Sequence, residues 1–303
     1  MSSAKLRTNI ASIELRNPLI LASGILGTTG SILRRVGEAG AGAVTTKSVG
    51  IKPRKGNPNP TVIQLDYGFV NAIGLSNPGI DRFMEEIKIA KEGGIPVIVS
   101  IFGANENEFM RIAEKVEEAR ADAIELNLSC PHGPSLHFAQ NSKLTYSVVS
   151  AVKSVVKLPV FAKLSPEVTD ITEIGLSAEK AGADAITAIN TLKAVVIDIK
   201  FVRPILSNIY GGLSGKAIKP VAVRCVYQLY ENLTIPIIGV GGITDYKDAI
   251  EFLMAGATAV QIGSAIAIKG LEIFKEINAG LKEFLEKEGY NDIQGIRGIA
   301  HRR

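Results

Sequence analysis

The stretch Ala121-Asp122-Ala123-Ile124-Glu125-Leu126 is a mostly apolar run, and Asn127-Leu128-Ser129-Cys130-Pro131-His132 follows it directly. The first stretch has the length and composition of a buried strand. The second carries a thiol, a proline and a histidine, and it opens a loop. Short apolar runs that end abruptly in polar or glycine residues recur along the chain, and this recurrence decides the fold.

Eight such runs are predicted to be strands, and most are apolar nearly throughout, as in parallel strands that are buried on both faces. They are Pro18 to Ser23, Ala43 to Lys47, Pro96 to Phe102, Asp122 to Asn127, Pro159 to Leu164, Asp184 to Asn190, Ile235 to Val240 and Ala257 to Gly263. Amphipathic segments between them are predicted to be helices. These are Ser31 to Ala39, Ile80 to Glu92, Glu106 to Ala119, Leu144 to Val156, Glu173 to Ala181, Ala217 to Tyr230, Asp245 to Met254 and Leu271 to Glu286. Three of the helices are expected to stop at a glycine, namely Gly40, Gly182 and Gly256.

Strands that alternate with helices eight times predict an α/β fold, a (β/α)8 TIM barrel, with residues 1–303 as one domain. A doubly wound sheet is the alternative. Leu6 to Leu15 is expected to form a small hairpin at the barrel bottom. The connections Ser48 to Gly79 and Thr191 to Gly215 are longer than a plain barrel needs. Both follow strands, so we expect functional insertions at the C-terminal face.

The composition narrows the class of protein. Of 303 residues, 46% are apolar and 21% charged, which suits a large core. The net charge is +4 with both signs interspersed, as in Glu114 to Arg120, so no nucleic-acid-binding stripe is expected. The chain shows no signal peptide and no membrane-length apolar run, which favours a cytoplasmic protein. Two cysteines suggest neither a disulfide framework nor a metal site.

Polar or glycine residues follow almost every predicted strand. The carboxyl ends of barrel strands converge on one mouth, so these residues should form a single polar ring. They are Ser23, Thr46-Lys47-Ser48, Ser100, Asn127 to Cys130, Lys163, Asn190-Thr191, Gly241-Gly242 and Gly263-Ser264.

Glycines after the last two strands suggest a bound phosphate. Gly241-Gly242 and Gly263-Ser264 occupy the usual phosphate-binding positions of a barrel, and Gly211 to Gly215 adds a third glycine-rich loop before a helix. Amides in such loops approach an anion closely because glycine has no Cβ.

Lys47 and Lys163 each end an apolar strand. A lysine at a barrel mouth needs a partner. It either neutralises negative charge on a bound ring or pairs with a carboxylate. A Schiff-base role, in a lyase or isomerase, is a further alternative.

Cys130 lies in the loop at the predicted mouth, and its thiol is a candidate nucleophile or proton-transfer base; an inert buried thiol is the alternative. Cys225, by contrast, lies within a helical segment and is interpreted as buried and inert. His132 and His137 share the loop of Cys130 but have no spacing that suggests a metal site.

These motifs, in this order, resemble class 1 dihydroorotate dehydrogenases over most of the chain, from about Asn17 to Ser264. The motifs are Thr46-Lys47-Ser48, Asn71-Ala72-Ile73-Gly74-Leu75-Ser76-Asn77, Asn127-Leu128-Ser129-Cys130-Pro131, Lys163-Leu164-Ser165-Pro166, Ile189-Asn190-Thr191-Leu192, Gly211 to Gly215 with Lys219-Pro220, and Gly241-Gly242.

The resemblance implies an FMN enzyme that oxidises dihydroorotate to orotate in pyrimidine synthesis. It implies that Cys130 takes a proton from C5 while hydride leaves C6 for the flavin. The implied FMN contacts are Ser23, Lys47, Ser48, Ser100, Asn127, Lys163, Ile189, Gly215, Gly241, Gly242, Gly263 and Ser264. The implied substrate contacts are Lys47, Asn71, Ala72, Ile73, Gly74, Leu75, Asn127, Asn190 and Thr191.

Departures from the family pattern keep one alternative open. His132 stands where the family usually has Asn, and Ser100 stands where subclass 1B often has Asn. Ser-Cys-Pro-His-Gly is also similar to the loop of dihydropyrimidine dehydrogenases, which act on uracil-type rings. The Asn190 to Pro220 stretch most resembles subclass 1B. That resemblance implies a homodimer that pairs with a second subunit carrying FAD and an iron–sulfur cluster, and passes electrons to NAD.

Overall fold

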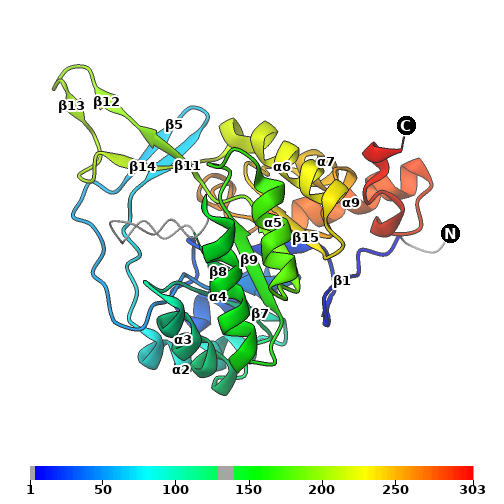
Figure 1. The fold of residues 1–303 in the computed structure, drawn as a ribbon. Helices are drawn as coiled ribbons and strands as arrows, with labels where there is room; N and C mark the ends of the chain where they lie inside the picture. Colours follow the sequence, from blue (N-terminus) through cyan, green and yellow to red (C-terminus); the bar gives the residue numbers. More distant parts are fainter. Residues whose placement is uncertain (1–3, 129–139, 303) are drawn as a thin grey trace.

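Eight parallel strands close into a barrel in the computed structural model, which describes residues 4–128 and 140–302 (Figure 1). The strands follow chain order around the barrel, and the last pairs with the first. This closure confirms the predicted (β/α)8 barrel over the doubly wound sheet. The strands are β3 (Leu19–Leu21), β4 (Ala43–Thr45), β7 (Val97–Ile101), β8 (Ala123–Asn127), β9 (Val160–Leu164), β10 (Ala185–Ala188), β15 (Ile237–Val240) and β16 (Ala259–Ile262).

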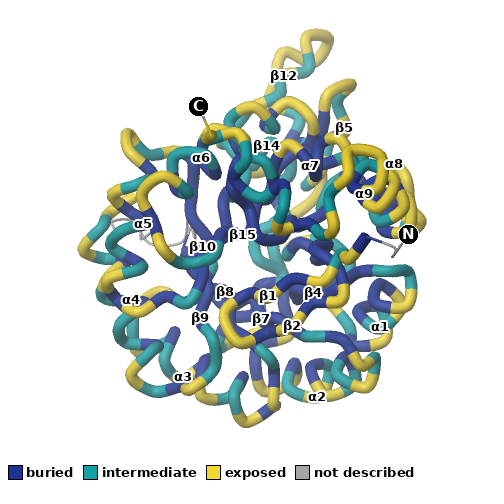
Figure 2. Tube along the Cα trace, turned by 90° about the vertical axis from the view of Figure 1, so that its right-hand side faces the viewer, coloured by how far each residue is buried: buried dark blue, intermediate teal, exposed yellow. Residues whose placement is uncertain are grey.

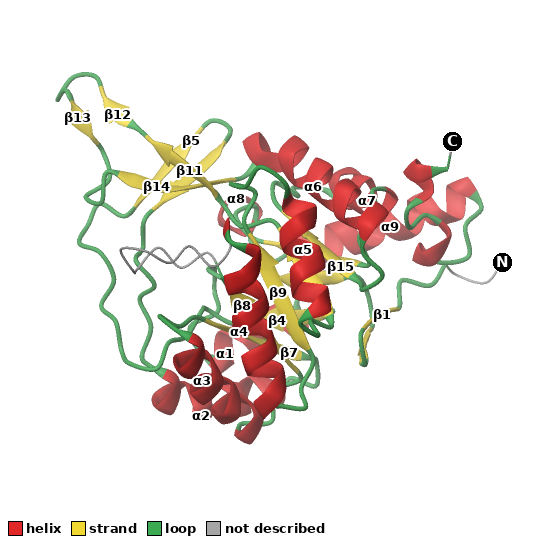
Figure 3. Cartoon of the chain, viewed as in Figure 1, coloured by secondary structure: helices red, strands yellow, loops and turns green. Residues whose placement is uncertain are grey.

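Helices surround the barrel, and each of the eight predicted helices is present (Figure 3). They are α1 (Gly30–Glu38), α2 (Ile80–Lys91), α3 (Glu106–Glu118), α4 (Ser142–Val155), α5 (Ile171–Lys180), α6 (Lys219–Asn232), α7 (Tyr246–Met254) and α9 (Ile273–Glu288). A short helix α8 (Ile266–Lys269) and the 3-10 turns Ile293–Gly295 and Ile299–His301 were not predicted. The helix predicted from Ala217 begins as a 3-10 turn, Lys216–Ile218, before α6. None of the helices in the described ranges has the length and apolar character that a membrane span requires.

Local signals in the sequence set where these helices begin and end. The Asn105 side chain accepts a hydrogen bond from the Glu108 amide at the start of α3, and Asp245 caps α7 in the same way. The prediction that three helices end at a glycine is also confirmed. Gly40, Gly182 and Gly256 follow α1, α5 and α7 with φ of +113°, +94° and +114°. Side chains with a Cβ rarely adopt such values, so each helix ends there.

The bottom of the barrel is filled by one apolar residue from each strand. We call these eight residues the barrel floor: Ile20, Ala43, Ile98, Ala123, Phe161, Ala185, Ile238 and Ala259. Below them lies the predicted hairpin, β1 (Thr8–Ile10) and β2 (Ile13–Leu15), whose Ile10, Ile13 and Leu15 join the same cluster. Figure 2 shows this hairpin lying across the centre of the barrel, inside the ring of helices. A barrel closed in this way has its other end available for a site.

The two long connections meet above the mouth in one antiparallel sheet, which we call the roof sheet. Its strands are β5 (Val62–Leu65) and β6 (Gly68–Asn71) from the first connection, and β11 (Leu192–Val195) and β14 (Tyr210–Ser214) from the second. Asn71 of β6 is paired with Gly212 of β14. The sequence placed both connections on the correct face but did not predict that they pair with each other.

A two-stranded hairpin extends beyond the roof sheet, built from β12 (Ile197–Asp198) and β13 (Arg203–Pro204) (Figure 1). Its apolar side chains are largely exposed, with Ile199 at 87% and Phe201 at 69%. Such an exposed apolar surface is unusual on an isolated soluble protein.

The barrel floor gives a test of the packing. Phe161 is fully buried, so Phe161→Ala should lower the free energy of unfolding by about 3–5 kcal/mol because it leaves a cavity. Urea denaturation measures the change. Phe201→Ala is the matched control, and it should alter stability by less than about 0.5 kcal/mol. Equal effects of the two substitutions would contradict this description of the floor.

Candidate active site at the barrel mouth

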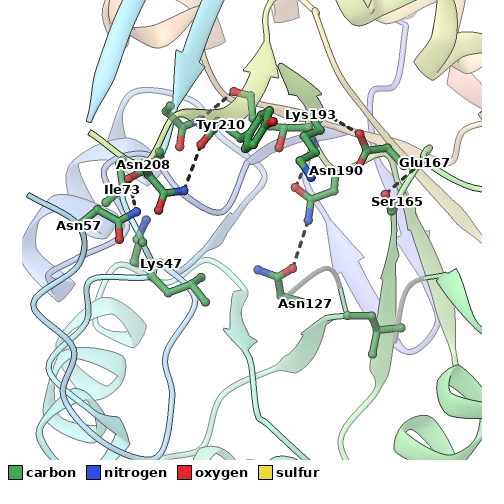
Figure 4. Close-up of a pocket in the computed structure, with 18 of the residues that line it drawn as sticks. Lys47, Asn57, Ile73, Asn127, Ser165, Glu167, Asn190, Lys193, Asn208 and Tyr210 are labelled. Atoms are coloured by element: carbon green, nitrogen blue, oxygen red, sulfur yellow. Dashed lines mark hydrogen bonds between the residues drawn. The ribbon is translucent and has the colours of Figure 1, made fainter. Parts of the chain in front are cut away.

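A cavity of about 590 Å³ lies between the strand ends and the roof sheet (Figure 4). It is lined by every residue that the sequence predicted to contact substrate: Lys47, Asn71, Ala72, Ile73, Gly74, Leu75, Asn127, Asn190 and Thr191. Asn127 ends β8, and Lys47 and Asn190 lie two residues past the ends of β4 and β10, whereas Asn71 comes from β6 of the roof sheet. Segments that are far apart in the sequence therefore form one cavity of a size that suits a small cyclic molecule.

The polar side chains of this cavity continue into a chain of hydrogen bonds across the strand ends. Asn190 Nδ2 donates to Asn127 Oδ1 at 3.1 Å, and Asn127 Nδ2 donates to Ser48 Oγ at 3.1 Å. Ser48 Oγ also lies 2.9 Å from Ser100 Oγ and 3.3 Å from Ser23 Oγ. Five of the predicted site residues are thus held in fixed positions by one another. The asparagine side chains keep part of their hydrogen-bonding capacity for a ligand.

Lys47 brings a positive charge to the cavity wall. Burial lowers the pKa of Lys47 from its ordinary value of 10.5, because removal from water disfavours the ammonium form. Among the described residues no carboxylate pairs with this ammonium. An anionic group on a bound ligand would supply the missing partner.

Lys163 has a different environment, in the interior of the barrel. Its Nζ lies 3.4 Å from Glu125 Oε1 and 3.4 Å from Gln261 Oε1. The sequence had left open whether Lys163 pairs with a carboxylate, and it does. Glu125 was missed because it stands in an otherwise apolar run. Its place two residues before Asn127 was the available signal, since residues two apart share one face of a strand.

The predicted phosphate cradle is compact. Gly215 and Gly242 lie so close that a Cβ on Gly242 would come 2.7 Å from the Gly215 carbonyl oxygen. Within the part of the chain that the structure describes, no backbone carbonyl accepts a hydrogen bond from the amides of Gly242, Gly263 and Ser264. These amides are available to an anion, so the residues present fit a phosphate group.

The remaining predicted cofactor residues surround the same end of the barrel without lining the cavity. Ile189 follows β10, and its amide donates to Val240 O at 2.9 Å, which joins the ends of β10 and β15. Of the predicted cofactor contacts, only Lys47 and Asn127 also line the cavity. The others are Ser23, Ser48, Ser100, Lys163, Ile189, Gly215, Gly241, Gly242, Gly263 and Ser264.

Cys130 lies outside the described residues, as do Ser129, His132 and His137. Cys225 is described, and the prediction that it is buried within a helix is confirmed. Burial raises the pKa of the Cys225 thiol, which disfavours the reactive thiolate. In residues 4–128 and 140–302, no group of three or more His, Cys, Asp or Glu side chains is arranged to hold a metal ion.

The family model described as dihydroorotate dehydrogenase matches residues 5–285. The chain belongs to the dihydroorotate dehydrogenase family. This family is flavin-dependent in general, which agrees with the phosphate cradle and the polar mouth.

Curated relatives place the chain close to one branch of the dihydroorotate dehydrogenase family. It is 53% identical to a protein of Pyrococcus abyssi over 97% of this chain and 99% of the relative. It is 54% identical to one of Methanosarcina acetivorans, over 97% and 95%, and 50% identical to one of Methanocaldococcus jannaschii, over 99% and 100%. All three are named dihydroorotate dehydrogenase B (NAD(+)), catalytic subunit.

The phosphate cradle can be tested with a single methyl group. Gly242→Ala should reduce the flavin retained on purification at least about tenfold, because the new Cβ meets Gly215 and Lys219 at a φ of +75°. Absorbance of the flavin released on denaturation measures occupancy. Gly270→Ala is the control, because Gly270 has a similar φ of +67° but nothing within 4 Å of its Cβ position. If both variants lost flavin equally, backbone strain rather than the cradle would be responsible.

Proposed function

We propose that this chain binds FMN and oxidises dihydroorotate to orotate in the synthesis of pyrimidine nucleotides. The observation that carries the proposal is the single cavity that collects all the predicted substrate contacts beside a glycine cradle with available amides. Membership in the dihydroorotate dehydrogenase family supports it.

The cavity matches the chemistry of this substrate. Dihydroorotate has a ring with alternating carbonyl and N–H groups and one carboxylate. Such a ring edge can form hydrogen bonds with asparagine side chains, which both donate and accept, and the cavity offers Asn71, Asn127 and Asn190. Asn71 Nδ2 already donates to Gly212 O at 3.3 Å, and its Oδ1 remains available to accept a hydrogen bond from a ligand. Lys47 is proposed to pair with the carboxylate, because it is a buried lysine of the cavity wall and no described carboxylate pairs with its ammonium.

FMN is held from two sides in this proposal. Gly215, Gly241, Gly242, Gly263 and Ser264 cradle its phosphate, and Lys163 presents charge to its ring system. Ser23, Ser48, Ser100, Asn127 and Ile189 complete the contacts at the strand ends. When bound, FMN supplies the acceptor for the hydride that leaves C6 of the substrate.

Cys130 is proposed as the base that removes the C5 proton. A thiol serves as a base only in its thiolate form, which requires a pKa below its ordinary value of about 8.5. The Cys130 loop begins directly after Leu128, which is buried, and Asn127, which lines the cavity. Cys130 follows Leu128 by only two residues in the sequence, and this short separation supports the proposed role.

The electrons are proposed to leave through a second subunit that carries FAD and an iron–sulfur cluster and reduces NAD. The chain has two cysteines, fewer than a four-cysteine cluster needs. Its relatives are named catalytic subunits of an NAD(+) enzyme. The proposed assembly is a homodimer of this chain with two such partners, and the exposed apolar hairpin β12–β13 is surface available for contact.

Comparison of two substrates tests the proposed reaction. The protein with bound FMN should turn over dihydroorotate with an artificial electron acceptor, and dihydrouracil, which lacks the carboxylate, should be a poor substrate. Turnover of dihydrouracil alone would replace the proposal with a dihydropyrimidine dehydrogenase activity. A purified protein that releases no flavin on denaturation would overturn it.

The role of Cys130 predicts a specific defect. Cys130→Ala should keep its bound FMN but reduce it about 10²- to 10⁴-fold more slowly with dihydroorotate at neutral pH, as expected for loss of a general base. Anaerobic stopped-flow absorbance measures the rate. Cys225→Ala is the matched control and should reduce its flavin at the wild-type rate. A normal rate in Cys130→Ala would assign the base to another residue.

The lowered pKa of Lys47 predicts how orotate affinity depends on pH. The ammonium form binds the carboxylate, so affinity should be full below the Lys47 pKa and should fall as pH rises through it, below 10.5. Equilibrium titration of flavin absorbance with orotate measures this. Lys47→Arg should flatten the fall, because arginine stays protonated over this range. An equal fall in the arginine variant would show that another group titrates.

A further inference from the structure

The interior of the barrel above its floor is polar, and apart from Lys163 the residues of this layer have no assigned role. Two residues beyond the floor positions, the strands place Thr45, Glu125, Lys163, Thr187 and Gln261, which we call the polar layer. All five are buried, Glu125 completely and Lys163 to 6% exposure. A buried acid and a buried base in a barrel that could have been filled with apolar side chains need an explanation.

Glu125 is held from three strands. Its Oε2 accepts a hydrogen bond from Thr187 Oγ1 at 3.0 Å and from Gln261 Nε2 at 2.7 Å. Its Oε1 faces Lys163 Nζ. Because β8 and β16 are not neighbours in the barrel, the bond to Gln261 crosses the interior. The carboxylate therefore has little freedom to move.

Lys163 has a donor that no described residue uses. An ammonium has three N–H groups, and Glu125 and Gln261 accept two of them. Within the described residues nothing accepts the third. Lys163 is paired in register with Asn127, whose side chain lines the cavity. The Lys163 backbone therefore lies beside a residue of the cavity wall.

We propose that Glu125, fixed by Thr187 and Gln261, is a positioning residue that sets the place and the net charge that Lys163 presents to the flavin, and so tunes the reduction potential of bound FMN. This inference rests on the proposed FMN site. Reduced FMN carries more negative charge on its ring system than oxidised FMN. A cation beside the ring favours the reduced form, and a carboxylate behind that cation weakens its effect.

The sign of the effect follows from this arrangement. Glu125→Gln removes the compensating charge, so the full charge of Lys163 acts on the flavin and the midpoint potential should rise. We expect the ratio of reduced to oxidised FMN at a fixed potential to increase at least about tenfold, which is about 30 mV for a two-electron couple. Glu125→Asp keeps the charge but withdraws it by one methylene, so its shift should have the same sign and be smaller.

The experiment is a spectroscopic redox titration of FMN bound to the full-length chain. Asp122→Asn is the matched control. Asp122 pairs with Lys91 at 2.6 Å, three residues before Glu125 and at the opposite end of the barrel, so its loss should leave the potential unchanged. In Glu125→Gln/Lys163→Met the potential should fall below that of Glu125→Gln, because the cation that Glu125 restrains is gone.

The outcomes separate this inference from the function on which it rests. FMN bound with a wild-type potential in both Glu125→Gln and Glu125→Asp would overturn the role of Glu125 and leave the FMN site intact. A rise that persists unchanged in the double variant would show that Glu125 does not act through Lys163. If Glu125→Gln does not fold, Glu125→Asp decides alone. Wild-type protein that binds no FMN after reconstitution would overturn both proposals.

Discussion

The ion pair between Glu125 and Lys163 is the interaction on which the site depends. A buried charge without a partner is strongly destabilising, so either residue alone would be a serious defect inside a barrel. Together with Thr187 and Gln261 they form a neutral, hydrogen-bonded layer between an apolar floor and an open mouth. The apolar floor residues pack against one another, and the polar layer holds a lysine and a glutamate in fixed positions. The mouth lies above both, because residues two apart along a strand point to the same side of the barrel wall.

The two ends of the barrel divide stability from binding. The hairpin β1–β2 closes one end with Ile10, Ile13 and Leu15. At the other end the roof sheet replaces a plain set of loops and walls a cavity with residues from both long connections. The side chains around that cavity hold one another through Asn190, Asn127 and Ser48, so a ligand meets groups that are already oriented. Such preorganisation reduces the entropy lost on binding.

The sequence predicted the elements and the barrel well, but it did not predict how the two long connections pair. Barrel strands and helices carry their own signals, such as the apolar run before Asn127 and the stops at Gly182 and Gly256. The roof sheet carries none, because β6 pairs with β14 more than a hundred residues away and each strand is short. Glu125 was hidden for a related reason. Its partners Lys163 and Gln261 come from distant strands, and only the closed barrel brings them together. Of the candidate site, the strand-end residues were predictable, whereas the charge beneath them was not.

The most direct test of the account is a crystal structure of this chain with FMN and orotate. We expect the orotate ring among Asn71, Asn127 and Asn190 with its carboxylate at Lys47. We expect the FMN phosphate at Gly242 and Ser264, and the Lys163 ammonium against the flavin ring with its contact to Glu125 retained. Orotate bound outside this cavity, or a flavin that does not reach Lys163, would contradict the account.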